Sequence, residues 1–149
     1  MTGYNNNPEA TAATIDADGW LHTGDLGTMD SRGYLRITGR VKEMIIRGGE
    51  NMFPAEIENV MLEHEDVGDI AIVGVPDDKW GEIIVGFIQP APGAQLDKNA
   101  LVAHCRSQLA APKTPAHWVE IGDWPLTGSG KIQRFVLRDR FVAGEFDPI

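Results

Sequence analysis

A glycine-flanked lysine lies near the end of the 149-residue chain. Lys131 follows Gly130 in a segment, 125–130, that holds a proline, a threonine, a serine and two glycines. Loops that cradle phosphates also place a lysine after a glycine. They need Ser or Thr directly after the lysine, and a second glycine five residues before the glycine that precedes it. Ile132 and Pro125 occupy those positions here. The segment therefore predicts a flexible loop that can carry an ammonium group into a cleft, with an exposed surface lysine as the alternative.

Asp25 and Arg40 are candidates for binding hydroxyl or phosphate oxygens. Asp25 follows Gly24, and a carboxylate can accept hydrogen bonds from two neighbouring hydroxyl groups at once. Arg40 follows Gly39, and its permanent charge and planar fork suit ribose or phosphate oxygens. The alternatives are an ordinary turn aspartate and a surface ion pair of Arg40 with Glu43 or Asp25.

Paired glycines at Gly48 and Gly49 predict a turn, because glycine tolerates positive φ at little cost. A ligand can also approach the backbone closely at such a turn. Trp80 is either an exposed aromatic that can stack on a ligand or a partly buried core residue.

Composition limits the classes of protein. With 42% hydrophobic and 23% charged residues, the chain can form one modest domain with a core, or a domain and a tail. No apolar run approaches about 20 residues, so no transmembrane segment is predicted. The polar residues 1–9 do not resemble a secretory signal, and a single cysteine, Cys105, fits a reducing cytosol. We therefore expect a cytoplasmic protein.

Charge narrows the ligands further. A net charge of −9 argues against nonspecific binding to nucleic acid or membranes. The basic residues are nevertheless gathered at 32–47 and 131–140, which leaves open either a small anionic ligand such as a nucleotide or two solvated charged faces. The four histidines have neither metal-ligand spacing nor a nucleophile beside them, so no metal site is predicted: His22, His64, His104 and His117.

The elements that must position these residues follow from the apolar pattern. Residues 1–18 predict an extended or partly mobile lead-in, followed by β pieces at 20–21, 34–37 and 41–46. Further strands are predicted at 69–75, 83–88 and 118–121. Helices are predicted from Pro54, after the N-cap Asp97, and at 133–142.

The order of these elements predicts an α+β fold. A small sheet with flanking helices is expected from about residue 41 onward, and a β-rich segment precedes it. Ile57, Val60 and Met61 should form the buried stripe of the first helix, while Glu56 and Glu58 should stabilise its start. Cys105 is expected to be a buried small hydrophobe rather than a nucleophile.

Four segments, taken together, resemble a known family. They are GWLHTGDL at 19–26, GRVKEMII at 39–46, GGENMFPAEIE at 48–58 and PLTGSGKI at 125–132. In this order and spacing they resemble the adenylate-forming family of acyl-CoA synthetases, nonribosomal adenylation domains and beetle luciferases. The resemblance runs from about residue 3 to residue 137, and the third segment is most similar to acyl- and aryl-CoA ligases.

The resemblance implies roles for the residues singled out above. Asp25 would hold the ribose of ATP, and Arg40 would bind the nucleotide beside it. Lys131 would be the catalytic residue, because a desolvated ammonium stabilises the negative charge that builds between the carboxylate and the α-phosphate. Lys42 would be the hinge about which the C-terminal domain rotates between two half-reactions.

The resemblance also implies a coenzyme A site. The backbone of Gly48 and Gly49 would line the passage for the pantetheine arm, where a Cβ would obstruct it. Trp80 would pack on the adenine of CoA. One departure weakens a further CoA contact: Pro112 precedes Lys113 where relatives often have an aromatic residue.

The implied reaction has two steps. A carboxylate attacks ATP to give an acyl-adenylate and pyrophosphate, and the thiol of CoA then displaces AMP. ATP, Mg²⁺ and CoA would serve the full enzyme. Residues 1–40 would end the large N-terminal domain, which is expected as the partner that carries the acyl pocket, and residues 41–149 would form the mobile C-terminal domain. The isolated chain is expected to be inactive.

Two alternatives stay open. The chain could belong to an adenylation domain that loads a carrier protein, or it could be a non-catalytic module that binds CoA or a partner. The presence of Asp25, Arg40, Lys42 and Lys131 together counts against the second alternative, because binding alone does not require the lysine.

Overall fold

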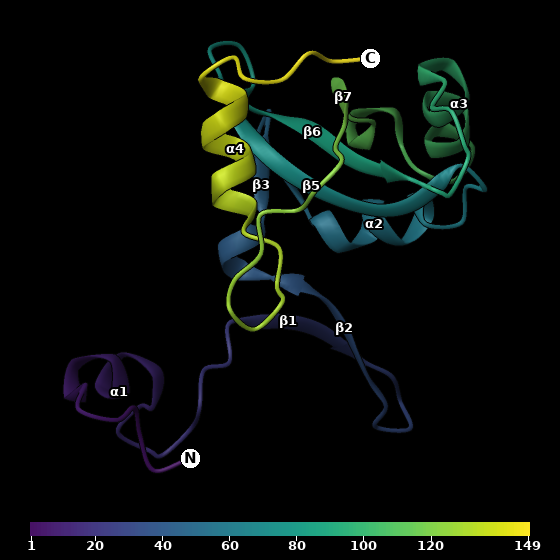
Figure 1. Cartoon of the computed structure of the whole chain (residues 1–149). Helices are drawn as coiled ribbons and strands as arrows, with labels where there is room; N and C mark the ends of the chain where they lie inside the picture. The colour runs from purple at the N-terminus through teal and green to yellow at the C-terminus, as the bar shows by residue number, and fades with distance from the viewer. The chain divides into compact units, whose positions relative to one another are not determined.

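The computed structural model describes all 149 residues (Figure 1). The chain divides into two compact units, Met1–Lys42 and Glu43–Ile149, and each is described by itself. No helix in either unit is long and apolar enough to cross a membrane.

The first unit begins with a short helix, α1 (Pro8–Thr14). The predicted extended lead-in is therefore wrong for these residues. The side chain of Asn7 caps the helix by accepting a hydrogen bond from the amide of Ala10 at 2.9 Å, and Pro8 occupies the first helical position, where its missing N–H is harmless. No residue of α1 is buried, so the sequence has no apolar stripe that would predict this helix.

The rest of the first unit contains a two-stranded antiparallel ribbon, β1 (Asp25–Met29) and β2 (Leu35–Arg40). Asp30 closes its turn by accepting hydrogen bonds from the amides of Arg32 and Tyr34. The bond from Tyr34 and that from the Arg32 side chain lower the pKa of the Asp30 carboxyl. The strand predicted at 34–37 is confirmed by β2, whereas residues 20–21 contribute only a single bridge, from Leu21 to Ile15.

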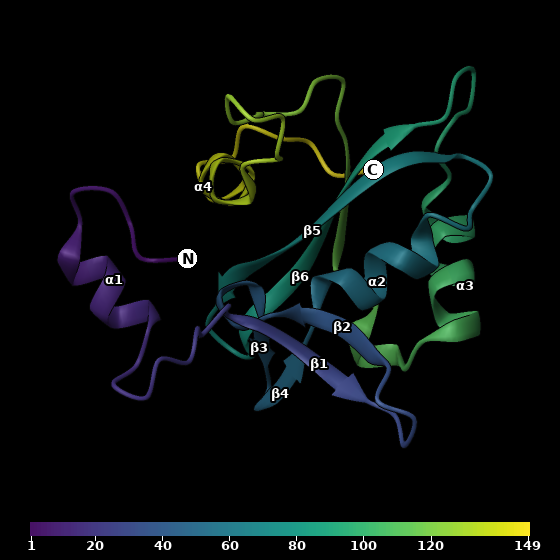
Figure 2. The same cartoon turned by 90° about the horizontal axis from the view of Figure 1, so that it is seen from below.

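The second unit is a five-stranded sheet with helices on both faces, which confirms the predicted α+β class (Figures 1 and 2). The strands run in the order β4-β3-β6-β5, and β7 pairs in parallel with β6. Its elements are β3 (Ile45–Arg47), β4 (Glu50–Met52), α2 (Pro54–Met61), β5 (Val67–Asp77), β6 (Gly81–Pro90), α3 (Lys98–Gln108), β7 (His117–Glu120) and α4 (Arg134–Val142).

Side chains of β5 alternate between two cores. Ile70 and Ile72 pack with α2 and α3, whereas Ala71 and Val73 pack with Leu137 of α4. Figure 2 shows α4 on one side of the sheet and α2 and α3 on the other. Burial on both faces explains why the predicted central strands read as continuous apolar runs rather than as alternating ones.

The helix predictions hold in outline. Helix α2 begins at Pro54, and Ile57 and Met61 are fully buried while Val60 is half-buried. Asp97 caps α3 by accepting a hydrogen bond from the amide of Asn99 at 2.7 Å. The strand predicted at 41–46 is wrong in its first half: Val41–Glu43 forms a turn of 3₁₀-helix, and β3 begins only at Ile45.

A close contact between β6 and β7 yields a prediction for stability. A Cβ added to Gly86 would lie 2.7 Å from Cε3 and 2.8 Å from Cζ3 of Trp118, whose side chain is fully buried. The ring cannot shift without disturbing the core, so we expect Gly86→Ala to lower the free energy of unfolding by about 1–3 kcal/mol. Urea denaturation measures this loss.

Gly122→Ala is the matched control. A Cβ there meets nothing within 4 Å, and the backbone is not left-handed. Equal stability of the two variants would contradict the close packing of Trp118 on Gly86.

Candidate functional site

Asp25 and Arg40 lie opposite one another at one end of the β1–β2 ribbon. Arg40 Nε donates to Asp25 Oδ1 at 2.8 Å, so the ion pair considered from the sequence is present. The amide of Val41 donates to the carbonyl of Gly24 at 2.9 Å, which fastens this end of the ribbon. The Arg40 side chain is 57% exposed and that of Asp25 28% exposed. Both retain polar atoms that can face a ligand.

Lys42 follows this pair directly. It lies in the exposed turn Val41–Glu43 and forms no ion pair. The boundary between the two units falls after Lys42. Its role as a hinge remains a prediction.

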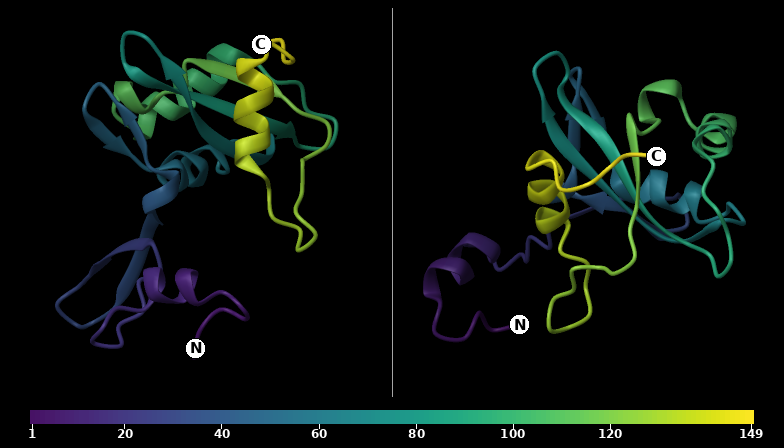
Figure 3. Two further views of the ribbon diagram at one scale, coloured as in Figure 1. Left: turned by 90° about the vertical axis from the view of Figure 1, so that its left-hand side faces the viewer. Right: turned by 45° about the horizontal axis from the view of Figure 1, so that its top comes forward.

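Lys131 lies in the loop between β7 and α4. Figure 3 shows this yellow-green loop as a hairpin. Leu126 and Ile132 form a bridge at its neck, and the amide of Thr127 donates to the carbonyl of Lys131 at 2.8 Å. Gly130 makes the reversal with φ of +80°, where a side chain would be strained. Lys131 is exposed, and no carboxylate pairs with it.

Thr127 organises this loop, whereas the sequence predicts it only as part of a flexible segment. Its hydroxyl accepts a hydrogen bond from the amide of Lys131 at 3.0 Å and shares another with Ser129 at 3.0 Å. Hydroxyl-to-backbone bonds of this kind stabilise turns. The threonine followed by glycines was the available signal for an ordered turn.

The base of the Lys131 loop is held by ion pairs. Arg134, the first residue of α4, donates from Nη2 to both oxygens of Glu58, at 2.8 and 3.0 Å. Glu43 Oε2 lies 3.4 Å from Arg134 Nη1. Burial acts to lower the pKa of Arg134, but the charges and hydrogen bonds of these carboxylates outweigh it and raise the pKa above its ordinary value.

The prediction that Glu58 stabilises the start of α2 is therefore wrong. Glu58 lies past the first turn of α2, and its carboxylate binds Arg134 instead. Glu56 does lie in the first turn, where it also pairs with Lys113 at 2.5 Å.

Gly48 and Gly49 form the turn between β3 and β4, and Trp80, from the turn between β5 and β6, lies beside them. Both glycines are left-handed, with φ of +61° and +84°, and the amide of Gly48 donates to the carbonyl of Trp80 at 2.8 Å. Trp80 is 43% exposed, so it is a surface aromatic and not a core residue. Lys79 Nζ and the guanidinium carbon of Arg47 lie 5.0 and 5.5 Å from its ring centre.

Other reactive side chains are placed elsewhere. Cys105 is fully buried on α3, as expected for a small core residue, and burial raises the pKa of its thiol. No three His, Cys, Asp or Glu residues are grouped so that they could hold a metal ion.

Comparisons with known proteins identify the family. The family model for the C-terminal domain of AMP-binding enzymes matches residues 56–131. Feruloyl-CoA synthase of Amycolatopsis is 46% identical over 142 residues, which are 95% of this chain and 28% of that protein. A fatty acid–[acyl-carrier-protein] ligase of Streptomyces coeruleorubidus is 45% identical over 95% of this chain and 27% of its own length.

A solved structure agrees with these relatives. The o-succinylbenzoate CoA synthetase of Bacillus subtilis, in complex with an acyl-adenylate, superposes with a TM-score of 0.87 at 35% identity, over 93% of this chain and 28% of that one. The chain thus spans 26–28% of the length of such curated relatives. The resemblance drawn from the four sequence segments is confirmed, and the chain belongs to the family of C-terminal domains of AMP-binding, adenylate-forming enzymes.

Proposed function

We propose that this chain supplies the C-terminal part of an ATP-dependent, AMP-forming acyl-CoA synthetase. The observation that carries the proposal is the exposed Lys131, which has no ion-pair partner and lies in an ordered hairpin loop of a domain of this family. An ammonium group so presented can enter a cleft and lose its water there. It then stabilises the negative charge that develops when a carboxylate attacks the α-phosphate of ATP and pyrophosphate departs.

Asp25 and Arg40 bind the ribose of the nucleotide in this proposal. The guanidinium of Arg40 fixes one carboxylate oxygen of Asp25 and leaves the other free to accept from the ribose hydroxyls. Residues 1–40 then form the end of a larger N-terminal domain, and residues 41–149 form the mobile domain. The division of the chain after Lys42 supports a hinge at that residue.

CoA reaches the acyl-adenylate past Gly48 and Gly49, and Trp80 packs on its adenine. The exposed ring of Trp80 and the neighbouring charges of Arg47 and Lys79 support a ligand with both a base and phosphates. Mg²⁺ accompanies the phosphates of ATP, because this ion is usually bound through substrate phosphates and one or two carboxylates. We further propose a cytoplasmic location and a role in fatty acid metabolism.

Joining the chain to an N-terminal domain tests the proposal. The N-terminal part of the Amycolatopsis feruloyl-CoA synthase is a suitable partner, because that enzyme is 46% identical to this chain over the shared part. We expect ferulate-dependent release of pyrophosphate from ATP by the joined enzyme and none by the 149-residue chain alone. Acyl-adenylate formation by the pure chain would overturn the proposal, as would an inactive but folded joined enzyme.

A carrier protein is the alternative acceptor. The Streptomyces coeruleorubidus ligase, named for a fatty acid and an acyl-carrier protein, is about as similar to this chain as the feruloyl-CoA synthase is. Supplying the joined enzyme with CoA and with a phosphopantetheine-bearing carrier protein in parallel separates the two. Thioester formation on CoA alone supports the synthetase, whereas transfer to the carrier protein alone supports the alternative.

Gly48→Ala should impair the second step of the reaction alone. The added Cβ would lie 3.1 Å from Cε3 of Trp80, at a φ of +61° that side chains rarely adopt. Because the resulting shift displaces the turn that lines the CoA path, we expect thioester formation to slow by about 10-fold or more. Adenylation should remain unchanged. Separate assays of pyrophosphate release and of thioester yield from added acyl-adenylate measure the two steps.

Gly93→Ala controls for backbone strain in the Gly48 variant. Gly93 has a φ of +80° and open space around it, in the loop between β6 and α3. Equal slowing of thioester formation by both variants would contradict a specific role for Gly48.

A further inference from the structure

Arg134 lies at the point where the Lys131 loop rejoins the folded core. It is the first residue of α4, three positions after Lys131. The amide of the intervening Gln133 donates to the carbonyl of Pro125 at 2.7 Å, which closes the loop at its base. Arg134 is therefore the first charged residue after the loop, and ion pairs hold its side chain at the base of the loop.

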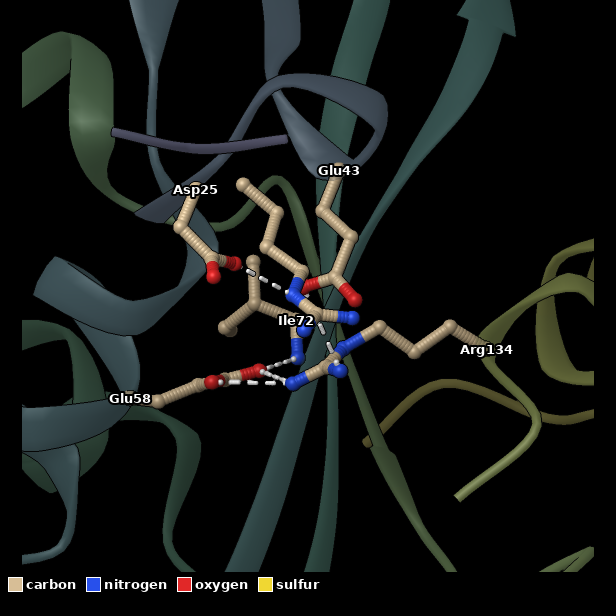
Figure 4. A network of polar contacts seen from close by, with 6 residues as sticks. Asp25, Glu43, Glu58, Ile72 and Arg134 are labelled. Carbon is tan, nitrogen blue, oxygen red and sulfur yellow. Dashed lines mark hydrogen bonds and ion pairs between the residues drawn. The ribbon is translucent and has the colours of Figure 1, made fainter. Parts of the chain in front are cut away.

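One partner of Arg134 belongs to the rigid part of the domain. Glu58 receives both hydrogen bonds from Nη2, and its Oε1 also accepts from the amide of Ile72 in β5 at 2.8 Å. The Glu58 side chain is only 13% exposed. Figure 4 shows the carboxylate of Glu58 facing the guanidinium of Arg134 and the amide of Ile72. Through Glu58, the start of α4 is tied to both α2 and β5.

The second partner of Arg134 lies beside the proposed hinge. Glu43 follows Lys42 in sequence, and its Oε2 is 3.4 Å from Arg134 Nη1. This is an ion-pair contact longer than a strong hydrogen bond. Glu58 thus holds the guanidinium in two short bonds, while Glu43 holds it loosely from a segment whose backbone adjoins Lys42.

The arrangement is poorly suited to stability alone. The side chains of Arg134 and Glu58 are 31% and 13% exposed. Such a partly buried ion pair contributes little to stability relative to well-packed apolar residues, and Arg134 Nε is buried without any hydrogen-bond partner. A planar guanidinium bound by two carboxylates instead holds its side chain in one orientation, since its donors form a rigid fork. A loop that presents a reactive lysine requires a fixed orientation.

We propose that Arg134 is a positioning residue for Lys131. Glu58 fixes the start of α4 and with it the lysine loop, and Glu43 makes the loop sensitive to the backbone just after Lys42. Arg134 itself touches no substrate. The proposal rests on the proposed function for the role of Lys131, but the geometry of the loop can be tested without any reaction.

The first test uses the 149-residue chain and backbone NMR. We expect Arg134→Gln and Glu58→Gln to shift the amide signals of residues 127–131 and to speed their hydrogen exchange, because the loop loses its anchor. Arg138→Gln is the matched control: Arg138 lies on the same helix and pairs only with its neighbour Asp139. Arg134→Lys keeps the charge without the fork, so it should restore the loop signals only in part.

The second test uses the joined enzyme described above. We expect Arg134→Gln to lower kcat for adenylation by roughly 10–100-fold, with KM for ATP changed by less than about threefold, since misplacing a reacting group slows the step without removing binding contacts. Thioester formation from added acyl-adenylate should be unaffected. Glu43→Gln should have a smaller effect on the same step.

Each outcome bears on one proposal or the other. Unchanged loop signals in folded Arg134→Gln, or equal loss of both half-reactions, would overturn the positioning role. If Arg134→Gln does not fold, Arg134→Lys and Glu58→Gln carry the same test. Full adenylation by Lys131→Ala, together with a displaced loop in the Arg134 variants, would refute the proposed function of Lys131 and leave its anchoring by Arg134 intact.

Discussion

Lys131→Ala should reduce adenylation by the joined enzyme by about 100–1,000-fold, the range found when one preorganised donor to a developing negative charge is removed. Lys131 has no competing carboxylate in the structure, and Thr127 and Gly130 fix the backbone that presents it. The loss should fall on kcat for pyrophosphate release, because the ammonium acts on charge that exists fully only in the transition state. Single-turnover release of pyrophosphate measures it directly.

Lys98→Ala is the matched control for Lys131→Ala. Lys98 is an exposed lysine at the first position of α3 and forms no ion pair. Thioester formation from added acyl-adenylate should survive in both variants. Pyrophosphate release by Lys131→Ala at the rate of the unaltered enzyme would show that the chain acts as a lid or binding module whose chemistry lies elsewhere.

Sequence reasoning succeeded where burial and capping dominate. The apolar runs at 69–75 and 83–88 became β5 and β6 because helices cover both faces of the sheet. Pro54 and Asp97 began helices for reasons that are local to the backbone. These signals are contained in a few consecutive residues, so they can be read without the fold.

The secondary-structure predictions were wrong where a local sequence pattern is compatible with two structures. Val41 to Ile46 is apolar and β-branched enough for a strand, but the amide of Val41 bonds to Gly24 and closes the first ribbon instead. In α1 the Asn7-Pro8 pair was a valid start signal, yet an exposed helix offers no apolar stripe to support it. The competing contacts in both cases lie outside the segment that was interpreted.

The candidate residues were found one by one, but their partners were not. Glu58 and Arg134 are 76 positions apart, and no periodicity links them. The tie of the lysine loop to α2 and β5 is a property of the folded sheet. The resemblance to the family pointed to Lys131 as the catalytic residue. Only the structure shows that the ion pairs of Arg134 hold the base of the loop that carries it.

Asp25→Ala should raise KM for ATP by about 10–100-fold. A hydrogen bond to a charged group contributes roughly 1.5–3 kcal/mol, and each 1.4 kcal/mol is about tenfold in affinity. Arg40 Nε donates a hydrogen bond to Asp25 Oδ1 at 2.8 Å and orients the carboxylate, which leaves Oδ2 for the ribose. Asp25→Asn keeps the shape but loses the charge, so its KM should lie between those of the alanine variant and the unaltered enzyme. Initial rates of pyrophosphate release over a range of ATP concentrations give these values.

Asp18→Asn controls for the loss of a negative charge in the same unit. Asp18 is exposed, and its side chain makes no hydrogen bond. Asp25→Ala also leaves Arg40 unpaired, so Arg40→Gln must be measured beside it. We expect Arg40→Gln to raise KM for ATP less than Asp25→Ala does, which would separate ribose binding from the loss of the ion pair. If Arg40→Gln raised KM as much as Asp25→Ala, the carboxylate would act only through Arg40. If neither changed KM, the pair would serve only to close the ribbon, and the nucleotide would have to be bound without this chain.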